Sequence, residues 1–179
     1  MNRISRPLVA LGLALAVAAC DEAPYKSQTQ DMSGESEVWD RMMVATKDAP
    51  LMLEVYGDRV YDDGLLIDIL PDVVSGAVDG RRIDVTINPD APSHPHIRIV
   101  FATNMTEAST SASLCRHDPD QQPVEGNARF TMVFCAGDKY MRGVTGELLQ
   151  GQGPDSDDFP KLLDQMAGEL LKRRSSSER

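Results

Sequence analysis

Hydrophobic and polar residues alternate or cluster along the middle of the chain in patterns that predict β-strands. The clearest alternation places Ile83, Val85 and Ile87 on one side of a segment and Asp84 and Thr86 on the other, as in a half-buried strand. Other segments are continuous apolar runs of strand length, rich in β-branched and aromatic residues. These patterns predict strands at residues 51–56, 82–88, 97–103, 128–135 and 139–146, the last two joined as a hairpin.

Hydrophobic residues also recur every three or four positions, which predicts helices within residues 36–47, 62–79 and 159–171. Ser36 is a suitable N-cap for the first helix. Lys172-Arg-Arg174 follows the last one, where positive charge suits the negative end of the helix dipole. Pro71 interrupts the middle segment. Because proline breaks or kinks a helix, we expect two short helical pieces or one kinked helix there, ending at Gly80.

The order of these elements predicts the fold class. Helix, strand and helix are followed by four strands and a final helix, which favours an α+β fold. We expect a mainly antiparallel sheet of about five strands with helices packed on one face. Residues 36–174 would form a single domain, with residues 175–179 as a frayed tail. Residues 104–127 are polar, and a loop of that length inside a domain needs something to pin it.

The first twenty residues carry a different pattern, that of a secretion signal. Arg3 and Arg6 precede the apolar run 8–19, which has the length of a signal-peptide core and is too short to span a bilayer. The run ends in Val17-Ala18-Ala19-Cys20. This ending resembles the lipobox of bacterial lipoproteins. The alternatives are an ordinary signal peptide with a coincidental Cys and a transmembrane anchor, and the polar stretch that starts at Asp21 argues against the anchor.

The resemblance implies where the protein is held. In bacterial lipoproteins the Cys receives a diacylglyceryl group and a peptidase cleaves just before it, and two or more acyl chains hold a protein stably on a bilayer. Residues 1–19 would then be a signal peptide, and the lipidated Cys20 would anchor a domain that faces the periplasm. Asp21 resembles the signal that keeps lipoproteins of enteric bacteria in the inner membrane. Attachment to the outer membrane is the alternative. We expect residues 20–35 to be the lipidated Cys and a flexible tether, because residues 21–35 are too polar to bury much surface.

Net charge narrows the choice of partners. Removing residues 1–19 takes away Arg3 and Arg6, so 16 of the 18 basic residues remain against 28 acidic ones, a net charge of −12. Such a surface repels nucleic-acid phosphates and anionic lipid headgroups. We therefore expect no nucleic-acid partner, whereas a basic partner or a cation would be accommodated. Solubility alone is the simpler explanation of the acidity.

The cysteines point to a disulfide bond. Cys20 is accounted for by lipidation, so Cys115 and Cys135 remain as one pair in an oxidising compartment. A bridge between them would pin the polar stretch 104–127. A catalytic dithiol is the alternative, but the spacing is not that of a Cys-x-x-Cys motif.

Histidines and acidic clusters give weak indications of a metal site. His94 and His96 could join Cys115 and His117 around a metal ion. An extended chain through Pro95 would point the first two to opposite sides, and Cys115 is better used in the disulfide. The acidic residues at 155–158 are better explained as helix caps than as a calcium loop. We expect no metal site and no cofactor.

Motifs of catalysis are missing from the sequence. It contains no Gly-x-Ser-x-Gly, Ser-x-x-Lys or His-Glu-x-x-His motif, and Ser109, Ser111 and Ser113 lie in a polar stretch. We expect a non-enzymatic lipoprotein whose domain contacts another component of the cell envelope. The alternative is a lipoprotein that binds a small ligand or a cation through its acidic surface and the loop 88–96.

Overall fold

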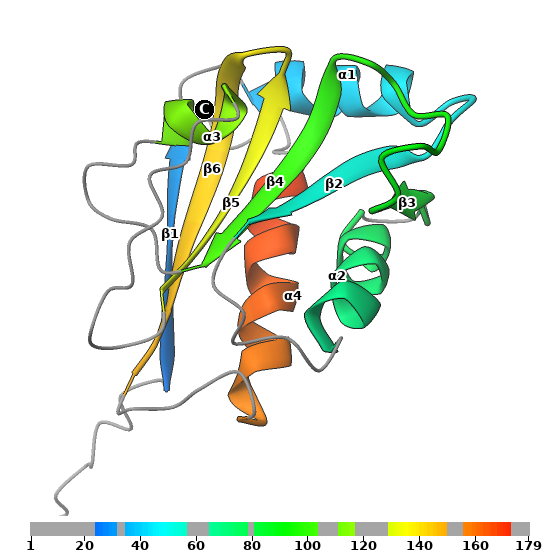
Figure 1. The fold of residues 1–179 in the computed structure, drawn as a ribbon. Helices are drawn as coiled ribbons and strands as arrows, with labels where there is room; N and C mark the ends of the chain where they lie inside the picture. Colours follow the sequence, from blue (N-terminus) through cyan, green and yellow to red (C-terminus); the bar gives the residue numbers. More distant parts are fainter. Residues whose placement is uncertain are drawn as a thin grey trace, which may run out of the picture.

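A computed structural model describes residues 24–31, 35–56, 65–78, 81–103, 111–116, 129–149 and 156–172 of this chain. Among them are four helices and six strands (Figure 1). The helices are α1 (Glu35–Ala45), α2 (Leu65–Gly76), α3 (Ser111–Cys115) and α4 (Asp158–Leu171). The strands are β1 (Tyr25–Asp31), β2 (Leu51–Tyr56), β3 (Val85–Thr86), β4 (Ile97–Thr103), β5 (Arg129–Ala136) and β6 (Lys139–Leu148). None of the helices described is long and apolar enough to cross a membrane.

The strands form one mixed sheet in the order β1-β6-β5-β4-β2-β3. β1, β6, β5 and β4 pair antiparallel, whereas β2 pairs parallel with both β4 and β3. The expected combination of helices with one sheet is confirmed, but the expectation of a mainly antiparallel sheet of about five strands is wrong, because the sheet is mixed and has six strands. The parallel part arises because the segments that follow β2 and β3 cross over before the chain returns to the sheet, and a crossover makes the next strand parallel.

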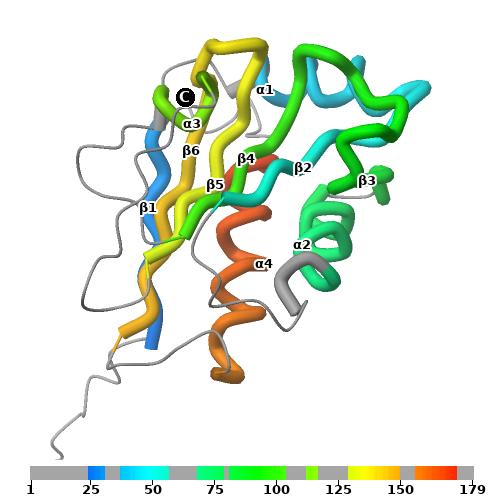
Figure 2. Tube along the Cα trace, viewed as in Figure 1, coloured from blue at the N-terminus to red at the C-terminus, as the bar shows by residue number. Residues whose placement is uncertain are grey.

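Helices cover both faces of the sheet, so the expectation that they pack on one face is also wrong. The larger core joins residues of α1, α2 and α4 to one face, including Phe101, Phe130 and Phe134. The opposite face carries a smaller cluster in which Leu114 and Cys115 of α3 are buried with four residues of β4 and β5: Val100, Ala102, Val133 and Cys135. The Cα trace of Figure 2 shows α4 and α2 beside each other, with α3 near the opposite edge of the sheet.

α4 matches its predicted hydrophobic stripe. Every stripe residue is buried: Phe159, Leu162, Leu163, Met166, Leu170 and Leu171. A positively charged side chain of β6 binds the C-terminal end of α4. Arg142 Nη1 donates to the carbonyls of Leu170 and Lys172 at 3.2 and 3.3 Å. An irregularity in the β5–β6 pairing leaves Met141 as an extra residue between Tyr140 and Arg142, and such a bulge redirects side chains.

α2 and β3 differ in extent from the prediction. α2 is one helix with Pro71 inside it, whose buried residues include Leu70 and Val74. Burial of this face compensates for the backbone hydrogen bond that proline cannot donate. In the segment predicted as a strand at 82–88, only Val85–Thr86 pairs with the sheet, although Ile83 is buried as its pattern indicates.

β1 lies within the segment that we expected to be a flexible tether, and for residues 25–31 that expectation is wrong. The strand pairs along its whole length with β6, from Tyr25 opposite Leu148 to Asp31 opposite Arg142. Its inward side chains make polar contacts with α4: Ser27 Oγ and Thr29 Oγ1 donate to the Glu169 carboxylate at 2.9 and 2.7 Å. The hydrophobic pattern did not predict this strand, because Ser27 and Thr29 contact α4 through side-chain hydrogen bonds and not through apolar burial.

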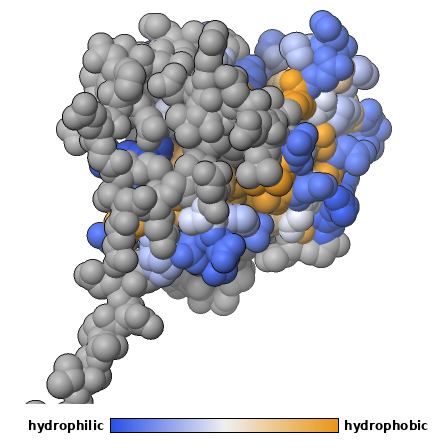
Figure 3. Space-filling model, turned by 60° about the horizontal axis from the view of Figure 1, so that its bottom comes forward, coloured by the Kyte–Doolittle hydropathy of each residue, from blue (hydrophilic) through white to orange (hydrophobic). Residues whose placement is uncertain are grey.

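The lower end of the molecule, where β1 begins and β6 ends, comes forward in Figure 3. Figure 3 shows hydrophobic residues there beside hydrophilic ones. The pocket at the other end of the sheet, beside α1, is lined by described residues.

Candidate functional site

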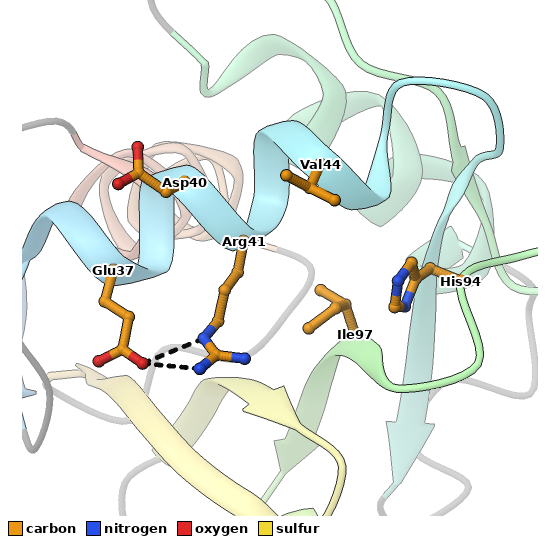
Figure 4. A pocket seen from close by; sticks show the side chains of 6 residues that line it. All are labelled: Glu37, Asp40, Arg41, Val44, His94 and Ile97. Carbon is orange, nitrogen blue, oxygen red and sulfur yellow. Dashed lines mark hydrogen bonds and ion pairs between the residues drawn. The ribbon is translucent and has the colours of Figure 1, made fainter.

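A pocket of about 530 Å³ lies between α1 and the start of β4. α1 contributes Glu37, Asp40, Arg41 and Val44, and the opposite wall consists of His94 and Ile97 (Figure 4). Glu37 and Arg41 project from the same side of the helix and form an ion pair, whereas Asp40 projects from the other side. The volume falls within the range of about 300–1,000 Å³ typical of small-ligand sites, but the helix wall is largely exposed.

α1 turns these residues outward because its other side is anchored in the core. Val38, Met42 and Ala45 are buried at helical spacing and belong to the larger core cluster. Residues on the remaining part of the helix surface therefore line the pocket. Val44 is the residue that stands out, because its relative exposure is 70%.

The polar end of the pocket is an ion pair within one helix. Arg41 donates to Glu37 Oε1 from Nε at 3.1 Å and from Nη2 at 2.7 Å. This hydrogen bond lowers the pKa of Glu37, with burial opposing it and the charges of Lys139 and Arg41 adding to it. Both side chains are about two-fifths exposed, at 40% and 43%, so the pair orients the side chains more than it stabilises the fold.

The apolar end combines an exposed and a buried aliphatic side chain. Val44 stands at the rim, whereas Ile97, the first residue of β4, is only 5% exposed. The ring of His94 lies beside Ile97 (Figure 4). The pocket therefore offers an aliphatic surface next to a charged pair, which suits an amphipathic group rather than a bare ion.

His94 is oriented by its own loop. Its Nδ1 accepts a hydrogen bond from the backbone N–H of His96 at 3.3 Å, which leaves Nε2 to carry the proton of the neutral ring. The two rings stand edge to face with centroids 6.3 Å apart, and only His94 lines the pocket. Within the described residues no group of three His, Cys, Asp or Glu could hold a metal ion. His117 lies outside those residues.

Cys115 and Cys135 are joined in a disulfide with a Cα–Cα distance of 5.5 Å, at the end of α3 and in β5. The bridge lies in the smaller cluster on the α3 face, whereas the pocket is lined by α1 and the start of β4. Three residues singled out from the sequence lie outside the described residues: Cys20, Ser109 and Asp155. Asp157 is the N-cap of α4 but makes no side-chain capping hydrogen bond.

The pocket was not predicted from the sequence, although its residues carried a signal. Val44 departs from the helical stripe that includes Val38 and Met42, so a helix built on that stripe must expose it. An exposed aliphatic residue between charged neighbours on a helix is a recognisable feature. What the sequence could not supply is the opposite wall, because residues 94 and 97 lie 50 and 53 positions after Val44 along the chain.

Comparisons with known proteins yield a distant structural likeness. No family model matches this chain, and neither does any curated protein. Two structures of a PelC dodecamer from Paraburkholderia phytofirmans, one of them a single-site variant, are similar to it at a TM-score of 0.46. Sequence identity is 12% and 14%, over 83% of this chain and 99% or 100% of the other. At this level the likeness carries no statement about function.

Proposed function

We propose that this protein is a membrane-tethered lipoprotein of the bacterial cell envelope, and that its domain contacts another envelope component through the pocket beside α1. The proposal has two parts with separate support. The lipobox at Val17–Cys20 supports the tether, and the exposed Val44 in a pocket with a charged rim supports the contact.

The sequence supports the tether through the agreement of independent features. A basic start, an apolar run and a small-residue ending on Cys20 occur in the order and spacing of a lipoprotein signal. A disulfide between Cys115 and Cys135 fits a compartment that is oxidising. The proposed location is the periplasmic side of the envelope, with the inner membrane favoured by Asp21.

The openness of the pocket favours a protein partner over a small molecule. Small-ligand sites bury most of their ligand, whereas the helix wall here is exposed at Val44 and about two-fifths exposed at Glu37 and Arg41. Aliphatic surface beside charged residues is typical of protein contact sites. A small ligand remains the second candidate because the volume of about 530 Å³ would suit one.

Substitution of Cys20 tests the tether. Cys20→Ala should leave the precursor uncleaved by the lipoprotein peptidase and abolish labelling with a radioactive or clickable fatty acid. The control is the disulfide variant Cys115→Ala/Cys135→Ala, which should still be labelled. A Cys20→Ala protein that still carries labelled acyl chains would show that the lipobox interpretation is wrong.

Site-specific photocrosslinking tests the contact. A benzophenone amino acid at Val44 should give an adduct in native membranes, whereas the same group at Asp164, on the exposed side of α4, should not. The crosslinked protein is identified by mass spectrometry, and its affinity capture by the domain without a crosslinker should be lost in Val44→Asp and kept in Asp164→Lys. Equal adducts at both positions, or capture that survives Val44→Asp, would overturn the proposed contact site.

A further inference from the structure

The distance between the proposed lipid anchor and the folded domain is short, because β1 starts soon after Cys20. Residues 21–24 are the chain between Cys20 and Tyr25, so five Cα–Cα steps connect the anchor to the sheet. At 3.3–3.6 Å a step, these residues reach at most about 18 Å when fully extended. A flexible chain of that length has an average reach of about 12 Å. The domain is thus held close to the bilayer surface, and this step rests on the proposed lipidation.

Tyr25 lies at one end of the sheet. It is paired with Leu148, the last residue of β6, and the backbone N–H of Leu149 donates to the Pro24 carbonyl at 2.9 Å. α4 begins at the same end, as Figure 1 shows, and Lys161 lies in its first turn, where Nζ is 2.8 Å from Asp158 Oδ1. We call this region, defined by Tyr25, Leu148 and Lys161, the anchor end.

The pocket lies at the opposite end. β1 and β6 run antiparallel, so Asp31 opposite Arg142 is about 20 Å from the anchor end, at 3.3 Å per residue. The β5–β6 hairpin closes this far end, and the Gly137 N–H donates to the His96 carbonyl, which joins the hairpin to the loop that carries His94. α1 lies across the same end in Figure 1.

The anchor end cannot separate easily from the rest of the domain. Seven residue pairs join β1 to β6, and Ser27 and Thr29 bind Glu169 of α4. The lipid therefore holds the whole domain by one end. The net charge of −12 after signal removal disfavours a domain lying flat on anionic lipid, so the far end is not drawn down to the bilayer.

We infer that the anchor end faces the membrane and that the pocket beside α1 faces away from it. The occupant of the pocket is then a protein that approaches from the periplasmic side, and not the bilayer that holds Cys20. The short linker sets this orientation, so lengthening the linker should relax it.

Contact quenching on vesicles tests the orientation. The lipidated protein is reconstituted in phosphatidylcholine–phosphatidylglycerol vesicles that contain a headgroup nitroxide lipid, with one fluorophore on Lys161→Cys or on Val44→Cys and the Cys115–Cys135 bridge intact. Quenching at position 161 should exceed quenching at position 44 several-fold. Inserting fifteen Gly and Ser residues after Asp21 should reduce the quenching at 161 toward that at 44.

Flotation of the vesicles separates the two proposals. Protein that does not float with the vesicles lacks the anchor, and the proposed tether fails together with this inference. Protein that floats but is quenched equally at positions 161 and 44, or more strongly at 44, keeps the tether and overturns the orientation. Quenching at 161 that does not change with the longer linker would also overturn it, because the short linker would then not be its cause.

Discussion

The two faces of the sheet are covered in different ways. On one face, α1, α2 and α4 bury a large apolar core that includes four phenylalanines: Phe101, Phe130, Phe134 and Phe159. On the other, the described cluster has six buried residues, of which two are the bridged cysteines. A face with little apolar surface gains less from burial, so a covalent bond carries a larger share of its stability. Within this domain, a covalent crosslink on one face thus takes the place of the apolar area that stabilises the other face.

A buried arginine also stabilises the packing of α3 against its face of the sheet. Arg98 of β4 is 7% exposed, and its guanidinium donates to the Gly137 carbonyl at 3.1 Å and to the Cys115 carbonyl at the end of α3. Its Nε lies 3.2 Å from Glu54 Oε2, although without hydrogen-bond geometry. Tyr56 also donates to Glu54 at 3.2 Å, and burial, followed by the charge and hydrogen bond of Glu54, raises the pKa of Tyr56. Polar contacts thus supply part of the stability that the smaller apolar cluster on this face does not provide.

The largest predicted effect is on the apolar face. Phe130 packs between Phe101 and Phe159, with ring centroids 6.0 and 4.9 Å apart. Phe130→Ala should lower the free energy of unfolding by about 3–5 kcal/mol, because it removes buried area and leaves a cavity. Urea denaturation followed by circular dichroism measures the change.

Val133→Ala is the matched control, since Val133 lies in the same strand but belongs to the cluster on the α3 face. It removes fewer buried carbon atoms and should cost roughly 2 kcal/mol. A loss at Val133 as large as that at Phe130 would contradict the difference between the two faces.

Breaking the disulfide should have the next largest effect. Cys115 and Cys135 are separated by 20 positions, and closing a loop of that size stabilises a protein by roughly 3 kcal/mol in the chain-entropy model. Cys115→Ala/Cys135→Ala should therefore lower the free energy of unfolding by about that amount. Hydrogen exchange should accelerate most at α3 and at the neighbouring residues of β5, and least in α4.

Alkylation checks the bridge independently. Unreduced mature protein should show no alkylated Cys115 or Cys135 by mass spectrometry, and the wild type treated with reductant should match the double variant in stability. Two alkylated thiols in the unreduced protein would rule out the bridge, and with it the covalent stabilisation of the face that α3 covers.

The elements that the sequence predicted well are those held by apolar burial. β2 and β4 begin and end at their predicted residues, and the stripe of α4 is buried throughout. β1 was missed because its inward residues include Ser27 and Thr29, which bind a carboxylate instead of entering a core. The parallel pairing of β2 was missed because the direction of a strand depends on a crossover between distant segments, and no local pattern records it.

The same distinction applies to the candidate site. Cys115 and Cys135 could be paired from composition and compartment, because few alternatives existed. The pocket could not be found this way, since Val44 and Ile97 become neighbours only through the tertiary fold. Sequence patterns indicate which residues are buried, but they do not indicate which exposed residues share a surface.

The smallest predicted effect lies in the polar contact between β1 and α4, inside the otherwise apolar face. Burial raises the pKa of Glu169, but hydrogen bonds from Gln165, Thr29 and Ser27 and the charge of Lys172 outweigh it, so the pKa is lowered overall. A carboxylate whose pKa is lower in the folded state stabilises the fold above its unfolded pKa of about 4.5, and this contribution is lost as the pH falls through the lower folded value.

At pH 7, Glu169→Gln should therefore lower the free energy of unfolding by on the order of 0.5–1 kcal/mol, a modest amount because the site is half-buried. As the pH falls below the lowered folded pKa of Glu169, the variant and the wild type should converge, because the protonated carboxyl is neutral like the amide. Asp164→Asn removes a carboxylate from the exposed side of α4 and is the matched control; at pH 7 it should lower the free energy of unfolding by less than Glu169→Gln. If both variants lose the same stability at every pH, the contact between β1 and α4 does not depend on the ionised Glu169, and β1 is held by its backbone pairing with β6 alone.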